Sequence, residues 1–264
     1  MKIAVAGKGG VGKTLIASGL AWSFSRAGLT TIAIDADPSP NLALSLGLSA
    51  KETSAIVPIS ENEALIKKKT GTSFPGVYNL NFSVDDIIRD FSVSTPSGVH
   101  LLVMGTVKSM GSGCTCPANS VTRALIRHLV VDQSDVVVLD MEAGIEHLGR
   151  GTAEQVDVMI VASDANKKSL AIAATIARMA QDAGIPRVEL VANRIENPGE
   201  ESLVRAFALE HQLAVLGIVP FDPAVVRAGI EGSPVMALEG TPAFCAIEAI
   251  GWKIMGSSSK IKIV

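Results

Sequence analysis

The glycine-rich run at residues 7–14 reads Gly-Lys-Gly-Gly-Val-Gly-Lys-Thr and fits the pattern Gly-x-x-x-x-Gly-Lys-Ser/Thr. Glycines in this pattern let backbone N–H groups turn inward around a phosphate chain, and the N-terminus of the next helix adds partial positive charge. We expect Lys13 to reach the β- and γ-phosphates and the Thr14 hydroxyl to bind Mg²⁺. The run therefore predicts a site for ATP or ADP with Mg²⁺. Its predicted nucleotide-binding residues are Gly9, Gly10, Val11, Gly12, Lys13, Thr14 and Leu15.

A second lysine, Lys8, lies inside the same loop. It cannot easily reach the same phosphates from the same side without crowding Lys13. We expect it to reach across a two-fold interface to the nucleotide of a partner copy, in the manner of an arginine finger. The alternative is an ordinary solvated lysine. The position of Lys8 thus predicts a homodimer.

Acidic residues follow two predicted strands: Asp35 and Asp37 come after residues 31–34, and Asp140 comes after residues 136–139. The carboxyl ends of parallel strands meet at one edge of a sheet, where open α/β sheets bind ligands. We therefore expect these carboxylates to lie beside the phosphate loop.

The loop with its extra lysine resembles the deviant Walker A motif, Lys-Gly-Gly-x-Gly-Lys-Ser/Thr. That motif marks the dimerising ATPases that include the Min and Par positioning ATPases and the nitrogenase iron protein. By this resemblance Asp37 positions or activates the attacking water, Asp35 lies near the magnesium shell, and Asp140 holds Mg²⁺ through water. Asn193 and Pro220 resemble the adenine-contacting positions, the first by its side chain and the second through nearby backbone. A simple turn role is the alternative for both.

Cys114 and Cys116 form a Cys-x-Cys pair in a stretch rich in glycine, serine, threonine and proline. They could be buried structural thiols, a redox pair or metal ligands. Soft metal ions commonly take four thiolates, and one chain offers only two close together. A two-fold axis through the loop would join two pairs into a Cys₄ site for one soft metal ion. We expect that site to form when ATP closes the dimer.

With residues 140–148, Asp-Met-Glu-Ala-Gly-Ile-Glu-His-Leu, the loop and the cysteine pair resemble the carbon monoxide dehydrogenase accessory ATPases, the CooC family. The resemblance runs over essentially the full chain. It implies an ATP-hydrolysing metallochaperone that helps insert nickel into carbon monoxide dehydrogenase or acetyl-CoA synthase. The ion at the Cys₄ site would then be Ni²⁺ or Zn²⁺, since tetrathiolate sites accept both. Glu146 and His147 would be transfer ligands for nickel, or a helix-opening acid and an interface histidine. Cys245, in an apolar helical stretch, is predicted to be a small buried side chain.

Two rival functions remain open: a positioning ATPase without a metal role, and an iron–sulfur reductase like the nitrogenase iron protein. Membrane positioning requires a basic amphipathic C-terminal helix, and residues 257–264 are too short and too rich in serine. DNA positioning requires a basic surface, of which the net charge of −3 gives no sign. We therefore expect neither a nucleic-acid nor a membrane partner. The reductase uses widely separated cysteines, and here the only distant one is Cys245.

The elements that must position these residues alternate between strand and helix patterns. The predicted strands are residues 2–6, 31–34, 100–104, 136–139, 156–161, 188–191 and 215–219; the predicted helices are 14–26, 120–130, 169–183 and 200–210. Several strands are continuous apolar runs, typical of strands covered on both faces. This alternation predicts a single α/β domain over residues 1–264, a P-loop NTPase fold with a mostly parallel twisted sheet and helices on both faces.

Two further local patterns stand out. Ser60 followed by Glu63 predicts a capped helix that carries the solvated lysines 67–69, and residues 256–264 are expected to be a flexible tail.

Composition limits the classes of protein. The 264 residues are 48% hydrophobic and 19% charged, which is normal for a packed core. Aromatic residues make up only 4%, which argues against a non-specific nucleic-acid binder. Three cysteines are too few for a disulfide scaffold. No apolar run reaches the roughly 18–20 residues of a membrane span, and the first strand runs straight into the glycine loop, unlike a signal peptide. We expect a soluble, cytoplasmic protein.

Overall fold

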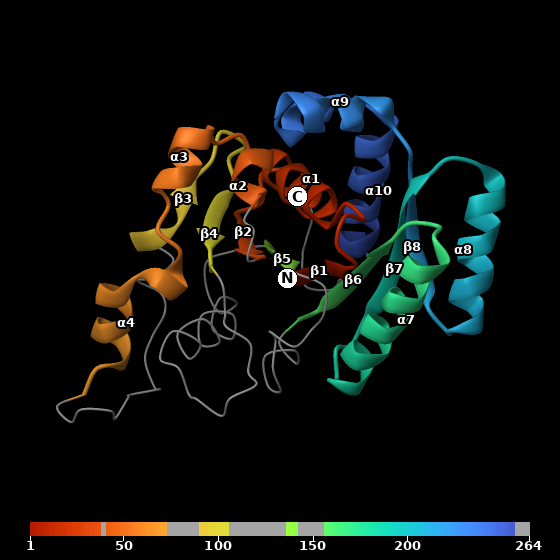
Figure 1. The fold of residues 1–264 in the computed structure, drawn as a ribbon, viewed down its shortest axis with the longest axis horizontal. Helices are drawn as coiled ribbons and strands as arrows, with labels where there is room; N and C mark the ends of the chain where they lie inside the picture. Colours follow the sequence, from red (N-terminus) through yellow and green to blue (C-terminus); the bar gives the residue numbers. More distant parts are fainter. Residues whose placement is uncertain (38–40, 73–89, 106–135, 142–155, 257–264) are drawn as a thin grey trace.

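The structure of the protein is a computed structural model that describes residues 1–37, 41–72, 90–105, 136–141 and 156–256 (Figure 1). Within these residues eight strands form one sheet in the order β3-β4-β2-β5-β1-β6-β7-β8. The strands are β1 (Lys2–Gly7), β2 (Thr31–Ala36), β3 (Val93–Ser94), β4 (His100–Val103), β5 (Val136–Met141), β6 (Val158–Ser163), β7 (Val188–Ile195) and β8 (Ala214–Pro220).

All neighbouring strands are parallel except β3 and β4, which are antiparallel. The predicted α/β class with a mostly parallel sheet is confirmed, and a strand occupies each of the seven predicted positions. The short edge strand β3 was not predicted.

The helices flank this sheet on both faces. They are α1 (Lys13–Arg26), α2 (Leu42–Ser45), α3 (Ala50–Ala55), α4 (Glu63–Thr70), α7 (Lys167–Asp182), α8 (Pro198–Glu210), α9 (Pro223–Glu231) and α10 (Pro242–Gly256), with short 3-10 turns at η1 (Ile59–Glu61) and η3 (Val235–Leu238). The predicted helix at 120–130 lies outside the described residues. None of the helices in the described ranges is long and apolar enough to cross a membrane.

The central strand β1 supplies two cores because its side chains alternate between the faces of the sheet. Ala4 and Ala6 pack into the cluster covered by α7 and α8. Ile3 and Val5 pack into the cluster covered by α1, α2 and α10. A strand buried on both faces needs apolar residues throughout, which explains the continuous apolar run that the sequence shows.

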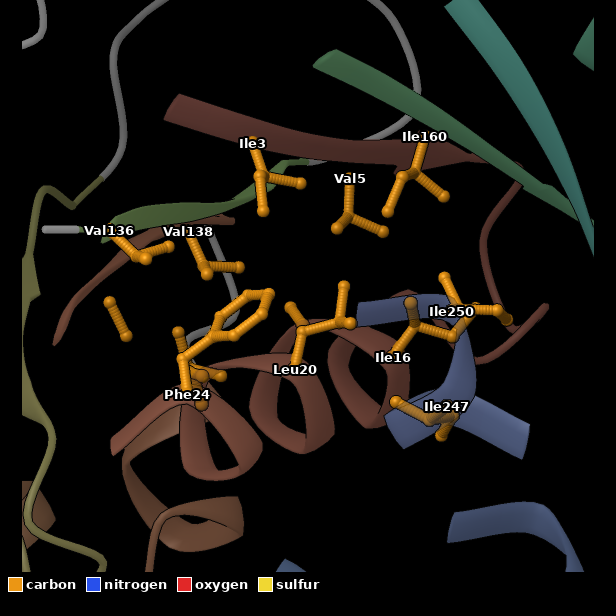
Figure 2. Close-up of a cluster of buried hydrophobic side chains, with 14 of the residues drawn as sticks. Ile3, Val5, Ile16, Leu20, Phe24, Val136, Val138, Ile160, Ile247 and Ile250 are labelled. Carbon is orange, nitrogen blue, oxygen red and sulfur yellow. The ribbon is translucent and has the colours of Figure 1, made fainter. Parts of the chain in front are cut away.

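Helix α1 is held between the sheet and α10. In Figure 2 Leu20 and Phe24 of α1 lie below the strand residues Ile3, Val5 and Val138. A Cβ at Gly19 would come within 2.9 Å of Ile247 Cγ2, so α1 and α10 approach closely where a side chain is missing. This packing fixes the helix that begins at the glycine loop.

The predicted start of the helix after residue 60 is wrong. Helix α4 begins at Glu63, and its cap is Asn62, whose side chain accepts a hydrogen bond from Leu65 N. Ser60 lies instead in the turn η1. A reciprocal capping box does form, but earlier in the chain, between Ser49 and Glu52 at the start of α3.

The predicted burial of Cys245 is also wrong, because its side chain is exposed. Helix α10 buries Phe244, Ile247 and Ile254 among others. One residue along a helix is about 100° of rotation, so the position after Phe244 turns away from the core.

Candidate nucleotide site

The glycine loop joins the end of β1 to the start of α1, the strand–loop–helix context that the sequence predicts. Gly12 precedes the helix with a φ of 93°, a left-handed conformation that side chains rarely adopt. A Cβ at Gly12 would also come within 2.2 Å of Asn193 Nδ2. Both the backbone conformation and the close approach therefore require glycine here.

The first turn of α1 places Lys13 and Thr14 at the carboxyl edge of the sheet. Lys13 is buried at 7% exposure, and its positive charge acts to lower the pKa of the neighbouring Asp140. The Thr14 hydroxyl donates a 2.6 Å hydrogen bond to Asp140 Oδ2 at the end of β5. The structure thus brings together three of the predicted residues, from the loop helix and from a strand far along the chain.

Asp35 and Asp140 lie opposite each other in the register of β2 and β5. Both carboxyl groups are buried, at 0% and 1% exposure. Burial raises the pKa of Asp140 to about 7, although the hydrogen bond from Thr14 lowers it. Burial likewise raises the pKa of Asp35 to about 6, against the backbone hydrogen bond from Leu42. A cation at this edge would favour the ionised forms.

The donor set at Asp140 fits Mg²⁺. Its Oδ1 atom is buried and accepts no hydrogen bond within the described part of the chain. A buried carboxylate oxygen without a partner is costly unless a cation or a donor meets it. Mg²⁺ prefers hard oxygen ligands, typically one or two carboxylates together with water and phosphate oxygens. Thr14 and Asp140 are the residues that would hold it.

Asp35 has a structural role that the sequence did not indicate. Its Oδ1 accepts a hydrogen bond from Asp37 N at 3.1 Å, and its Oδ2 accepts one from Leu42 N at 3.0 Å. One buried carboxylate therefore ties together both ends of the segment that follows β2. Asp37 is half-buried at the start of this segment, and residues 38–40 lie outside the described part of the chain.

A cavity of about 470 Å³ lies beside the loop. It brings together four residues that the sequence predicts for the nucleotide: Gly12, Leu15, Asn193 and Pro220. The apolar side of the cavity comes from α9 and the turn before it, which were not predicted to bind the nucleotide. These residues include Phe221, Val225, Val226 and Ile230. The spacing of Val226 and Ile230, four residues apart on one helix face, was the available signal.

The roles predicted for Lys8, the cysteine pair, Glu146 and His147 remain predictions. Lys8 is half-buried in the loop, and its predicted role needs a second copy of the chain. Cys114, Cys116, Glu146 and His147 lie outside the described residues. Within the described ranges no group of three or more His, Cys, Asp or Glu side chains is placed to hold a metal ion.

Residues 2–235 match the CobQ/CobB/MinD/ParA nucleotide binding domain. The chain belongs to this family. The carbon monoxide dehydrogenase accessory protein CooC of Rhodospirillum rubrum is 43% identical over 234 residues, which cover 88% of each chain. An ATP-binding protein of Methanocaldococcus jannaschii is 41% identical over 238 residues, covering 89% of this chain and 91% of that protein. The predicted relationship to the CooC group is confirmed.

Solved structures share the fold at low sequence identity. MinD in the MinC:MinD complex of Aquifex aeolicus has a TM-score of 0.71 and 20% identity, over 99% of this chain and 98% of that one. MinD of Pyrococcus horikoshii with bound Mg-ADP has a TM-score of 0.68 and 16% identity, over 98% of this chain and 99% of that one. The predicted P-loop fold is confirmed, and the protein is an ATPase of the MinD/ParA type.

Proposed function

We propose that this ATPase is a metallochaperone that helps insert nickel into carbon monoxide dehydrogenase or acetyl-CoA synthase. The observation that carries the proposal is the 43% identity to CooC over 88% of both chains. The Cys-x-Cys pair of this sequence, Cys114 and Cys116, supplies ligands of the kind that soft metal ions require.

The metal ion is the cargo, bound between two copies of the chain. Each copy offers two thiolates, and four thiolates form a tetrahedral site for one Ni²⁺ or Zn²⁺. ATP binding closes the homodimer and joins the Cys114/Cys116 pairs of both copies. Hydrolysis opens the dimer, so that the ion passes to the client enzyme. In a carrier of this kind the affinity for the metal ion depends on whether ATP or ADP is bound.

Catalysis of hydrolysis by this chain consists of positioning and charge stabilisation. Lys13 contacts the terminal phosphates from within one copy, and Lys8 contacts them from the other. Asp37 accepts a hydrogen bond from the attacking water and orients it. Thr14 and Asp140 would hold Mg²⁺, and the bound ion would supply positive charge against the phosphates.

The base of the nucleotide occupies the cavity lined by Leu15, Asn193 and Pro220. Its apolar wall suits the faces of a purine ring, and Pro220 offers backbone groups at the rim. The Asn193 amide has one N–H and one lone pair beyond its bonds in the structure. An asparagine amide can pair with the N6 and N7 edge of adenine, so the site favours ATP.

A positioning ATPase is the second candidate, because the fold similarity to MinD reaches a TM-score of 0.71. That function gives no role to Cys114 and Cys116. An iron–sulfur reductase is the third candidate. Because Cys245 is exposed and not buried, one argument against that function no longer holds. A brown colour in protein purified without oxygen would favour that reductase.

A transfer assay tests the proposed function. Nickel-free carbon monoxide dehydrogenase is incubated with the nickel-loaded protein, with ATP or a non-hydrolysable analogue, and its activity is followed. We expect activation with ATP for the wild type and for Cys245→Ser, a control that changes a cysteine outside the pair. The Cys114→Ser/Cys116→Ser variant should give no more activation than free nickel gives. Equal activation by both variants would refute the proposal, and the same assay with acetyl-CoA synthase identifies the client.

A further inference from the structure

Asn193 makes a long-range contact with the phosphate loop. Its side chain is 1% exposed at the carboxyl end of β7, and its Nδ2 donates a 2.7 Å hydrogen bond to the Val11 carbonyl. The two residues are 182 positions apart in the chain. The missing side chain of Gly12 leaves the space that the amide fills. This contact ties the glycine loop to the far half of the sheet.

The bond to Val11 also sets the direction of a phosphate-loop donor. The C=O and N–H of a trans peptide point in opposite directions in one plane. The Val11 carbonyl points to Asn193, so the N–H of Gly12 in the same peptide points away from it. Among the hydrogen bonds of the described residues, none uses this Gly12 N–H. It is therefore an available donor on the opposite side of the loop from Asn193.

The amide is itself held in one orientation. Asn193 Oδ1 accepts a 2.9 Å hydrogen bond from the backbone N–H of Arg194. Arg194 has a φ of 60°, in the left-handed region, where the pairing of β7 with β8 shifts register between Ala192 and Ile195. Such backbone persists only where the surroundings determine it, and such positions cluster at functional sites. With its oxygen engaged by Arg194, the amide must present its NH₂ group to the loop.

We propose that Asn193 is a positioning residue for the phosphate loop, which turns the Gly12 N–H toward the phosphate chain independently of any contact with the base. The inference rests on the ATPase site alone and not on nickel delivery, so the two can fail separately. It assigns Asn193 an effect on ligands that have no base at all.

Inorganic tripolyphosphate with Mg²⁺ separates the two roles because it has phosphates and no base. Its inhibition constant against ATP hydrolysis is measured for the wild type, Asn193→Ala and Asn193→Asp. Asn193→Asp keeps the acceptor for Arg194 but faces the Val11 carbonyl with an oxygen. The matched control is Asn197→Ala, which removes a nearby asparagine that caps α8 and does not contact the loop. Thermal unfolding verifies that each variant is folded.

We expect the inhibition constant of tripolyphosphate to be about tenfold higher for both Asn193 variants than for the wild type. Loss of one partner of a buried hydrogen bond costs about 1.4 kcal/mol, which corresponds to a factor of ten. Tripolyphosphate should inhibit Asn197→Ala as strongly as the wild type, even if the melting temperature of this variant is lower. Wild-type inhibition by tripolyphosphate in either folded Asn193 variant, with only ATP affinity reduced, would show a base contact alone and overturn the proposal.

Discussion

Replacing Asp140 by asparagine should stabilise the protein without nucleotide while it abolishes hydrolysis. The Asp140 carboxyl is buried, and one of its oxygens has no hydrogen-bond partner within the described residues. Without Mg²⁺ its ionised form is unfavourable in the fold. An amide removes that charge and can still accept the hydrogen bond from Thr14. The same change removes the carboxylate that would hold Mg²⁺, so stability and activity should move in opposite directions.

The magnitude follows from the pKa. Burial raises the pKa of Asp140 from 3.8 to about 7. Between these values the folded state binds more protons than the unfolded state, so stability falls as the pH rises through this window and levels off above pH 7. At about 1.36 kcal/mol per pKa unit, the ionised carboxylate costs roughly 4 kcal/mol at pH 8. The new amide leaves an unpaired N–H group that costs about 1–3 kcal/mol. Asp140→Asn should therefore be about 1–3 kcal/mol more stable at pH 8.

The assay is urea unfolding of nucleotide-free protein in EDTA at pH 5 and pH 8. The wild type should be less stable at pH 8 than at pH 5, and Asp35, whose pKa is raised to about 6, acts in the same direction. The variant should lose a large part of this pH dependence. Equal stability of the wild type at pH 5 and pH 8, or an Asp140→Asn variant less stable than the wild type at pH 8, would show that the buried carboxylate does not destabilise the fold.

Three other substitutions test separate parts of the structure. Lys8→Ala should lower ATP hydrolysis about 10³-fold, since a residue acting in trans like an arginine finger is worth that much, and an unchanged rate would exclude the role. Gly12→Ala should weaken Mg-ATP binding at least about tenfold in calorimetry, because of the strained φ and the close amide; wild-type affinity would count against the loop geometry. Arg26 lies over the rings of Trp22 and Phe244 and forms ion pairs with two glutamates. Arg26→Ala should therefore lower the free energy of unfolding by about 1 kcal/mol. An unchanged free energy of unfolding would mean that these partly exposed contacts do not stabilise the fold.

The features of the site that the sequence predicted are local ones. The glycine loop, Lys13 and Thr14 form a continuous motif whose chemistry depends on spacing alone. Asp140 was predictable because strand ends of a parallel sheet share an edge, and its bond to Thr14 follows from that placement. Fold class followed in the same way, since strands buried on both faces show nearly continuous apolar runs.

The features that the sequence did not reveal depend on tertiary contacts. The bond from Asn193 to Val11 joins residues 182 positions apart, and no pattern near either residue indicates it. The exposure of Cys245 depends on which side of α10 meets the core, and the apolar residues before and after it do not indicate that side. The cap of α4 was misplaced because Ser60 and Asn62 are both good capping residues and only the backbone selects between them.

A metal site shared by two copies of the chain fixes the number of metal ions per dimer, so that number is the measurement to make. Ni²⁺ and Zn²⁺ bound per dimer are measured with and without nucleotide, together with the molar mass in solution. The proteins compared are the wild type, Cys114→Ser/Cys116→Ser and Cys245→Ser. We predict about one metal ion per nucleotide-bound dimer for the wild type and for Cys245→Ser, and none for the double variant, which still binds ATP. Metal binding that survives the loss of both Cys114 and Cys116 would exclude the shared Cys₄ site.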